Sequence, residues 1–315
     1  MRLHTILFSA LILLSSHAFA QTKDNDKKDE NDLMSLLNED APAKKSYSTA
    51  TFKTTRIGNG HSIENVAKGV LDVRISHRFG MINQGFKDLY GLDNASMRMG
   101  FDYGVSDRLM LGIGRSSYLK EYDGFLKYKI LRQVSDKKWS LGLSYVGAAS
   151  VQTIDVNYDN YDFGYRVAYT NQLLLAKKIN ANISIQLMPT HVHYNMVNLK
   201  KESNDVFALG VGGRVKLTNR LSLTGEYYYQ LNPNISALDP TENTTNCMTL
   251  GIDLETGGHV FQMLFTNSMG IAERNFIGET TGKWSKGDVH FGFNISRVFT
   301  VVKPKGFENS RTKIW

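Results

Sequence analysis

Charged side chains recur along the chain at positions that could line a polar passage. In residues 69–80, Arg74 and Arg78 alternate with apolar residues such as Val73 and Ile75. Successive side chains of a β-strand point to opposite faces, so this segment presents one apolar and one charged face. The same pattern along the chain gives a charged face with the basic residues Arg74, Arg78, Arg98, Lys127, Lys129, Arg166, Arg214 and Lys216 and the acidic residues Asp72, Asp102, Glu226 and Asp253.

This charged face carries more basic than acidic residues. Charged linings bias which ions enter a pore, so the pattern predicts a channel or binding barrel for a small anionic solute. The alternative is that opposite charges pair across neighbouring strands and obstruct the lumen. Arg74 and Asp102 are expected to lie close to register and to form one such pair. Both interpretations stay open from the sequence.

A local group of charges is expected at one mouth of the barrel. Arg78, Arg98, Arg115 and Asp123 each lie toward the long-loop end of their segments. We therefore expect these four side chains to gather near the outer mouth.

Glycines also recur on the charged face. Glycine inside a strand marks a bend or the close approach of another backbone. These glycines either help a barrel to curve or make room for residues 49–66 as a plug. They are Gly100, Gly104, Gly112, Gly114, Gly142, Gly210, Gly212 and Gly292.

The residue types that support enzymatic or metal chemistry are sparse. His191 and His193 share a strand face at i, i+2, but two ligands are too few to predict a metal site. His77 and His290 have no serine or acidic partner at a convincing spacing, and nucleophile–base pairs depend on geometry. We therefore predict no metal, no cofactor and no enzymatic activity. A lipid-modifying barrel enzyme is the remote alternative.

About twelve alternating segments in residues 69–300 carry these residues. Short turns such as 106–107 and 218–219 alternate with long loops such as 80–94 and 267–286. Single-chain bacterial outer-membrane barrels have an even number of strands, short turns on one side and long loops on the other. A soluble lipocalin-like barrel has about eight strands, and a closed barrel of twelve is too wide for wall side chains to fill. The pattern predicts an all-β fold, a transmembrane antiparallel up-and-down β-barrel with its apolar faces toward lipid.

The remaining segments differ in composition from the barrel region. Residues 1–20 resemble a secretory signal peptide, with an apolar run before Ala18-Phe19-Ala20. Residues 21–48 are polar and charge-rich, which predicts a disordered periplasmic segment. Residues 49–68 are expected to cap the periplasmic mouth or to enter the lumen as a plug, and residues 301–315 form a basic tail. These features predict a bacterial outer-membrane location with both termini in the periplasm.

Short motifs of glycine, aromatic and charged residues recur in the barrel region. They are His77-Arg78-Phe79-Gly80, Gly91-Leu92-Asp93, Asp102-Tyr103-Gly104, Gly112-Ile113-Gly114-Arg115-Ser116, Tyr122-Asp123-Gly124, Lys127-Tyr128-Lys129 and Phe265-Thr266-Asn267-Ser268. In these motifs the chain resembles an uncharacterised outer-membrane β-barrel family of Bacteroidetes-type bacteria, over roughly residues 50–300. The resemblance implies a barrel in the outer membrane. It implies no substrate and no catalytic residue, because that family is a domain of unknown function.

The expected partners follow from this location. They are outer-membrane lipid, the barrel assembly machinery and a periplasmic protein. The net charge of +7 comes from scattered basic residues, so nucleic acid is not a predicted partner. The alternative to the channel is a structural or partner-binding barrel with a closed lumen, which engages another protein through its loops or its periplasmic segment.

Overall fold

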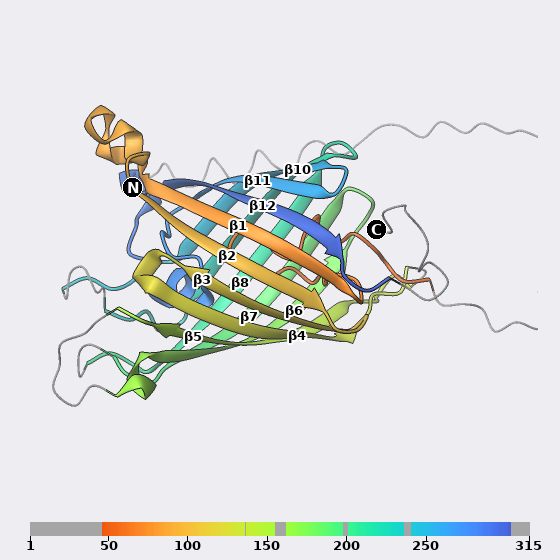
Figure 1. The fold of residues 1–315 in the computed structure, drawn as a ribbon, viewed down its shortest axis with the longest axis horizontal. Helices are drawn as coiled ribbons and strands as arrows, with labels where there is room; N and C mark the ends of the chain where they lie inside the picture. Colours follow the sequence, from red (N-terminus) through yellow and green to blue (C-terminus); the bar gives the residue numbers. More distant parts are fainter. Residues whose placement is uncertain (1–45, 136, 155–161, 198–200, 236–240, 304–315) are drawn as a thin grey trace, which may run out of the picture. The chain divides into compact units, whose positions relative to one another are not determined.

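Twelve antiparallel strands close into a barrel in the computed structural model, which describes residues 46–135, 137–154, 162–197, 201–235 and 241–303 (Figure 1). The strands are β1 (Val70–Met81), β2 (Ala95–Gly104), β3 (Leu109–Ser116), β4 (Glu121–Leu131), β5 (Gly142–Gln152), β6 (Val167–Lys178), β7 (Ile183–Tyr194), β8 (Asp205–Lys216), β9 (Leu221–Gln230), β10 (Cys247–Thr256), β11 (His259–Thr266) and β12 (His290–Thr300). The predicted fold class is confirmed.

Each strand pairs with its neighbours in sequence, and β1 pairs with β12 to close the ring. Ile75 of β1 lies opposite Ile295 of β12 on one side and opposite Met99 of β2 on the other. Because the barrel is closed, the backbone N–H and C=O groups of every strand find partners on a neighbouring strand. An open sheet would leave those of its two edge strands unpaired in lipid. The topology is therefore the up-and-down order expected from the alternating short and long connections.

The two faces of the wall differ as the alternation predicts. In β2, Met97, Met99 and Phe101 are exposed on the outer face, whereas Arg98 and Asp102 are buried on the inner face. An apolar exterior and a polar interior are the arrangement of a membrane barrel. The wall is thus built to face lipid.

The connections define two ends of the barrel. Residues 105–108, 132–141, 179–182, 217–220 and 257–258 connect strands at what we call the short-turn end. The other connections form the long-loop end and contain the helix α2 (Glu273–Gly278) and the 3-10 turns η1 (Ile82–Gln84), η2 (Phe86–Gly91), η3 (Tyr118–Lys120), η4 (Phe163–Arg166) and η5 (Trp284–Lys286). Val70 pairs with Thr300, so the chain enters and leaves the barrel at the short-turn end.

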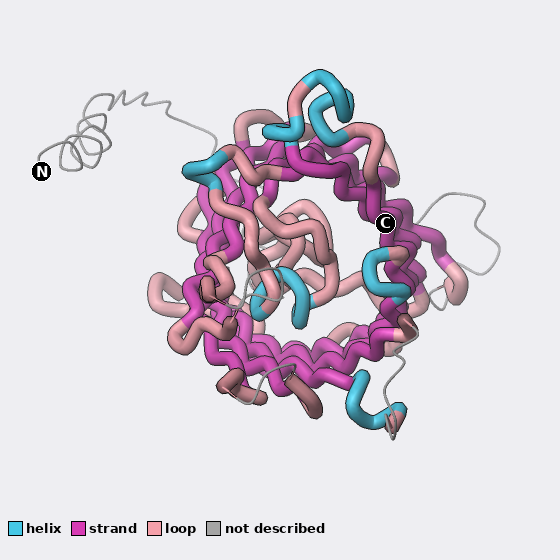
Figure 2. Tube along the Cα trace, turned by 90° about the vertical axis from the view of Figure 1, so that its left-hand side faces the viewer, coloured by secondary structure: helices cyan, strands magenta, loops and turns pink. Residues whose placement is uncertain are grey.

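Residues 46–68 are not part of the wall, and we call them the plug segment: residues 46–48 lie against the 132–141 connection at the short-turn end, and residues 51–66 enter the barrel. Figure 2 shows this loop, together with α2, inside the ring of strands. The segment turns back on itself at an isolated bridge between Arg56 and His61, where the Ile57 amide donates to the Gly60 carbonyl. Residues 51–63 are buried throughout, apart from a partly buried Lys53. The lumen is therefore occupied by chain that is continuous with β1.

An apolar cluster also lies within the lumen. Phe52, Ile57 and Ile63 of the plug segment belong to the same cluster of buried side chains as Phe276 and Ile277 of α2. Wall residues complete it, among them Met110, Phe125, Met188 and Tyr228. A membrane barrel with a polar lining thus contains a small core of its own, which packs the plug segment against α2.

Two predicted strands begin later than expected. Trp139 and Leu141 continue the alternation of the fifth segment backward, which predicts a start at Trp139, but β5 begins at Gly142. Phe163 and Tyr165 do the same for the sixth, but residues 163–166 form η4, and the Asp162 carboxylate accepts a hydrogen bond from the Gly164 amide to cap it. At residues 163–166 the capped turn therefore forms in place of a strand, although the alternation of residues continues through it.

Several predictions fall on residues outside the described ranges. They concern the signal peptide 1–20, nearly all of the polar segment 21–48 and most of the tail 301–315. In the described part of the chain, no helix is long and apolar enough to cross a bilayer.

Candidate functional site

The tip of the plug segment is held by one wall carboxylate. Glu226 of β9 accepts hydrogen bonds from the backbone amides of Asn59 (2.6 Å) and Gly60 (3.1 Å). The Gly58-Asn59-Gly60 tip fits because added Cβ atoms on its glycines would crowd Thr249 and Tyr228. Hydrogen bonds to an ionised acceptor are among the strongest available to a backbone amide. Glu226 therefore anchors the tip near the middle of the lumen.

The side chain of Asn59 ties the tip to further strands. Its Nδ2 donates to the hydroxyls of Thr249 (3.1 Å) in β10 and Thr266 (3.2 Å) in β11. Its Oδ1 accepts from Nη2 of Arg78 in β1, at 2.6 Å. With Glu226, these contacts bind the tip to one arc of the wall, from β9 round to β1.

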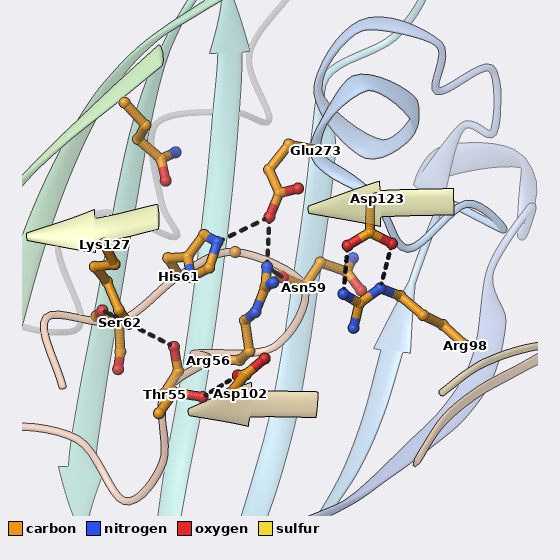
Figure 3. Close-up of polar contacts among 12 residues, drawn as sticks. Thr55, Arg56, Asn59, His61, Ser62, Arg98, Asp102, Asp123, Lys127 and Glu273 are labelled. Atoms are coloured by element: carbon orange, nitrogen blue, oxygen red, sulfur yellow. Dashed lines mark hydrogen bonds and ion pairs between the residues drawn. The ribbon is translucent and has the colours of Figure 1, made fainter. Parts of the chain in front are cut away.

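The two arms of the plug segment are recognised mainly through their backbone. Lys127 of β4, which lies beside Ser62 in Figure 3, donates to the backbone carbonyls of Ser62 (3.0 Å) and Glu64 (2.6 Å). Side-chain amides of the wall donate to backbone carbonyls of the plug segment in the same way: Gln186 to His61 (2.7 Å), Gln262 to Ile57 (2.9 Å) and Asn294 to Gly58 (3.0 Å). Wall side chains thus take the place of a neighbouring strand for a segment that has none.

Arg74 does not form the predicted pair with Asp102. Its Nη2 lies 3.0 Å from Oδ2 of Asp72, two residues away on the same face, and 2.8 Å from the hydroxyl of Thr55. Asp102 instead accepts from Thr55 Oγ1 at 3.2 Å. The register explains the difference, because Asp102 lies opposite Asp72, and Arg74 lies opposite Gly100. Both charges bind the plug segment.

An ion pair connects the plug segment to the long-loop end. Arg56 Nη1 lies 2.5 Å from Oε1 of Glu273, the first residue of α2, and Nε2 of His61 lies 3.2 Å from the same oxygen (Figure 3). Burial would raise the pKa of Glu273, but the Arg56 guanidinium and His61 hold it well below its usual range. Burial lowers the pKa of His61 well below its usual value, and the nearby charge of Arg56 lowers it further. The cluster is therefore an Arg56–Glu273 charge pair beside a neutral imidazole.

Helix α2 closes the lumen from the long-loop end. Phe276 packs edge-to-face on Tyr228 with ring centroids 5.2 Å apart. The Tyr194 hydroxyl donates to the Arg274 carbonyl at 2.8 Å, and the Gln230 side chain donates to the Ile277 carbonyl at 2.5 Å. Two segments far apart in sequence, the plug and α2, therefore meet inside the barrel and are both bonded to its wall.

The predicted outer-mouth cluster forms only in part. Arg98 and Asp123 make a bidentate pair, with Nε to Oδ1 at 2.8 Å and Nη2 to Oδ2 at 2.5 Å. Arg115, in contrast, is exposed on the outer face, where its guanidinium lies over the Tyr122 ring at 5.6 Å. Arg78 turns toward Asn59. The expectation of one four-residue group is therefore wrong.

The other predicted lining residues are distributed unevenly. Lys127 and Arg214 are buried on the inner face, and Lys129 is partly buried near the short-turn end. Arg166 is not a wall residue, because it lies in η4 at the long-loop end. The structure also places Glu121 on the inner face, where it accepts a hydrogen bond from Asn275 of α2.

The inward glycines make room for what fills the lumen. A Cβ at Gly212 would collide with Ile57, and one at Gly104 would collide with the backbone of Ala67. At Gly100 and Gly114 it would collide with the Arg98 side chain. Most of these glycines thus accommodate the plug segment or a large buried side chain.

Cavities remain on both sides of the plug segment. One of about 360 Å³ opens at the short-turn end and is lined by plug and wall residues, among them Lys53, Glu64, Asp72 and Glu255. Another of about 310 Å³ lies at the long-loop end, where Asn94, Asn275, Glu279 and His290 contribute to its lining. Each is large enough for a small polar solute, and the plug segment and α2 lie between them.

The plug segment's own contact residues have little signal in the sequence. Arg56, His61 and Glu273 were not among the predicted site residues, although they form the contact between the plug and α2. The one available signal was the Gly58-Asn59-Gly60 run, which is typical of a tight turn. Its partners Glu226 and Thr266 are 167 and 207 residues away from Asn59, so these contacts become visible only once the barrel closes.

A closed barrel of twelve strands with an apolar exterior and a polar, occupied lumen defines an outer-membrane-type β-barrel. The chain matches the model of the membrane-bound beta barrel domain family DUF5777 over residues 52–299, and it belongs to this family. The match begins within the plug segment, so most of the plug is part of the family's domain. No curated protein matches the chain significantly.

Several solved membrane barrels are similar to the chain at low sequence identity. The NanC porin is 8% identical with a TM-score of 0.45, and the match covers 74% of this chain and 100% of that one. An outer-membrane channel from Pseudomonas putida F1 is 14% identical with a TM-score of 0.44, covering 75% and 97%. Omp33 from Acinetobacter baumannii is 10% identical with a TM-score of 0.38, covering 73% and 97%. Likeness at this level assigns no substrate to the chain.

Proposed function

We propose that the protein is an outer-membrane barrel that its plug segment closes at rest, and that small polar solutes pass when this segment leaves the lumen. The observation that carries the proposal is the tip at Asn59 and Gly60, which is bonded to Arg78, Glu226 and Thr249 on different strands. Lys127 of β4 and Gln186 of β7 bind the arms from the other side of the ring, so the segment as a whole lies across the passage between the two end cavities.

The plug segment is bound in a way that allows it to leave. Many of its contacts are hydrogen bonds between its backbone and wall side chains such as Lys127 and Gln262. Such a bond contributes only about 0.5–1.5 kcal/mol net, because water replaces it on release. In the described part of the chain, the segment pairs with no barrel strand; its backbone bridges the wall at Tyr47 and Val134, in a connection, and continues into it at Gly69. Its release from the lumen therefore breaks no ladder between strands. The barrel can therefore stay closed as a sheet while the lumen opens.

The solute class follows from the lining that release would expose. The predicted bias toward anions rests on Arg74, Arg78 and Arg98. Inward carboxylates at Glu121 and Asp123 offset part of that positive charge. The geometry therefore favours small polar solutes in general over anions in particular.

The orientation is part of the proposal. Long loops face the exterior and short turns the periplasm in barrels of this type. The long-loop end then faces outward, both termini lie in the periplasm, and the plug segment enters from the periplasmic side.

Binding of a periplasmic protein is the second candidate function. It is favoured by the cavity of about 360 Å³ at the short-turn end, which plug residues and wall residues line together. A partner that binds there would contact the segment whose position closes the lumen. The two functions are compatible, because such a partner could supply the force that withdraws the plug.

A redox-controlled plug tests the proposal. Asn59 Nδ2 lies 4.0 Å from Sγ of Cys247, the chain's one cysteine, so Asn59→Cys places a second thiol beside it. The reduced variant loses the bonds of Asn59 and should admit small polar solutes into proteoliposomes faster than the wild type. Oxidation should attach the tip to β10 and abolish the flux.

Asn59→Ser is the matched control, since it loosens the tip without adding a thiol. It should be permeable under both redox conditions. Equal flux through oxidised and reduced Asn59→Cys, with the disulfide verified by mass spectrometry, would contradict closure by the plug segment.

A further inference from the structure

A cluster of two imidazoles and a carboxylate lies on the outer wall at the long-loop end, away from the plug. His191 Nε2 lies 2.7 Å from Asp205 Oδ1, and His193 Nδ1 lies 2.8 Å from the same oxygen. One donor atom from each residue lies within 4.8 Å of the other two. Among the residues that the structure describes, this is the one trio of metal-ligand types so close together.

The strand register builds this cluster. His191 and His193 share the outer face near the end of β7, and Asp205 begins β8 directly opposite His193. The third group was invisible in the sequence, because it comes from the far side of a long loop. Two imidazoles on one strand thus gain a carboxylate from the next.

Neighbouring groups position the cluster. The His191 ring stacks on Phe207 with centroids 4.8 Å apart. The Asp205 backbone is held on both sides, because its amide donates to Ser203 Oγ and its carbonyl accepts from Asn232 Nδ2. The protein covers these side chains only in part, with 33% of His191, 39% of His193 and 43% of Asp205 exposed at the long-loop rim. The donors are therefore pre-oriented and accessible.

We propose that His191, His193 and Asp205 bind a zinc ion. Imidazole nitrogens and carboxylate oxygens are ordinary zinc ligands at about 2.0–2.2 Å, and three protein ligands plus water complete a tetrahedral site. Two donors bound tetrahedrally at that distance lie about 3.3 Å apart, so the present nitrogen–oxygen distances need to open by only about half an ångström. Side chains this exposed can make that adjustment without moving the strands.

The bound ion would join β7 to β8 at the root of the loop between them. That loop, residues 195–204, contributes to the long-loop end, and its neighbour Tyr194 bonds to α2. Zinc would therefore fix the outer rim next to the helix that closes the lumen. This inference does not depend on the proposed function, because the site lies outside the barrel.

Zinc binding is measured by isothermal titration calorimetry on the full chain, refolded in detergent without a polyhistidine tag and stripped with a chelator. The expected result is one Zn²⁺ per barrel, with no competition from Mg²⁺. His191→Gln and His193→Gln should each weaken binding by at least roughly tenfold, a loss seen even for residues that only support metal ligands. His259→Gln is the matched control, an outward histidine at the opposite end of the barrel, and should change nothing.

A second measurement uses only the wild type, so it does not depend on the folding of a variant. Zinc should protect His191 and His193, but not His259, from carbethoxylation mapped by mass spectrometry. Absent binding, or binding that survives both substitutions, would overturn the proposal and leave the trio as two hydrogen bonds from histidines to Asp205.

Discussion

Glu226 shows how a single wall residue holds the plug segment. Its carboxylate accepts from the amides of Asn59 and Gly60 and faces the tip from the middle of β9. Glu226→Gln keeps the shape but removes the charge that strengthens these bonds. Hydrogen bonds to charged groups contribute about 1.5–3 kcal/mol, so we expect the docked plug to lose stabilisation on that order.

Hydrogen exchange of residues 51–63, followed by mass spectrometry, measures this loss. The Glu226→Gln barrel should exchange these amides faster. Glu255→Gln is the matched control, because Glu255 pairs with Lys53 at the exposed rim, where such pairs contribute little. Unchanged exchange in Glu226→Gln would show that the tip is held by other groups.

His61 makes plug docking sensitive to pH. Burial lowers its pKa in the docked state, Arg56 and Lys127 lower it further, and Glu273 opposes them. A histidine whose pKa is depressed on docking is neutral there, whereas the released plug takes up a proton below about pH 6.5. Docking is therefore weakened as the pH falls from about 6.5 toward the lower pKa of the docked state.

Hydrogen exchange of the plug amides, corrected for their intrinsic exchange rates, should accordingly become faster as the pH is lowered from about 7.5 to about 5.5. His61→Gln cannot take up this proton and should flatten the dependence. A dependence that persists in His61→Gln would assign it to another group.

At the scale of the elements, alternation predicted most of the barrel because a strand's two faces differ sharply in polarity. The same rule already places Arg115 outward, since it shares parity with Leu111 and Ile113. It failed at Arg166, where a capped turn continues the pattern without being a strand. The plug contacts could not be predicted, because Asn59 meets Glu226 and Thr266 only across a closed ring. The alternation of residues thus predicts which side chains face lipid and which face the lumen, whereas the contacts of the plug segment depend on closure of the barrel.

Leu111 tests whether the apolar face of the wall meets lipid. Leu111 is 44% exposed and pairs with Leu126 near the middle of β4. Leu111→Arg should destabilise the folded barrel by about 2–4 kcal/mol, as expected for arginine facing lipid at mid-bilayer. Reversible unfolding in lipid vesicles measures this. Leu231→Arg, just beyond β9 at the long-loop end, should cost about 0–1 kcal/mol, and equal costs at the two positions would contradict the assigned membrane span.

At the scale of the whole molecule, the chain combines a complete barrel with an internal obstruction from its own N-terminal side. The wall is closed by strand pairing alone, and the lumen is closed by the plug segment and α2 from opposite ends. These are separate sets of contacts. The opening proposed above therefore requires the plug segment to move but leaves the strand pairing of the wall intact.

Single-channel recording in planar bilayers tests this claim most directly. The refolded full chain should be silent, and a chain lacking residues 46–66 should give discrete conductance steps. The double variant Arg56→Gln with Glu226→Gln, which keeps the whole chain, should also open intermittently and guards against misfolding of the shortened one. Steady conductance from the wild type, or silence from both altered barrels once they are shown to be folded, would contradict closure by the plug segment.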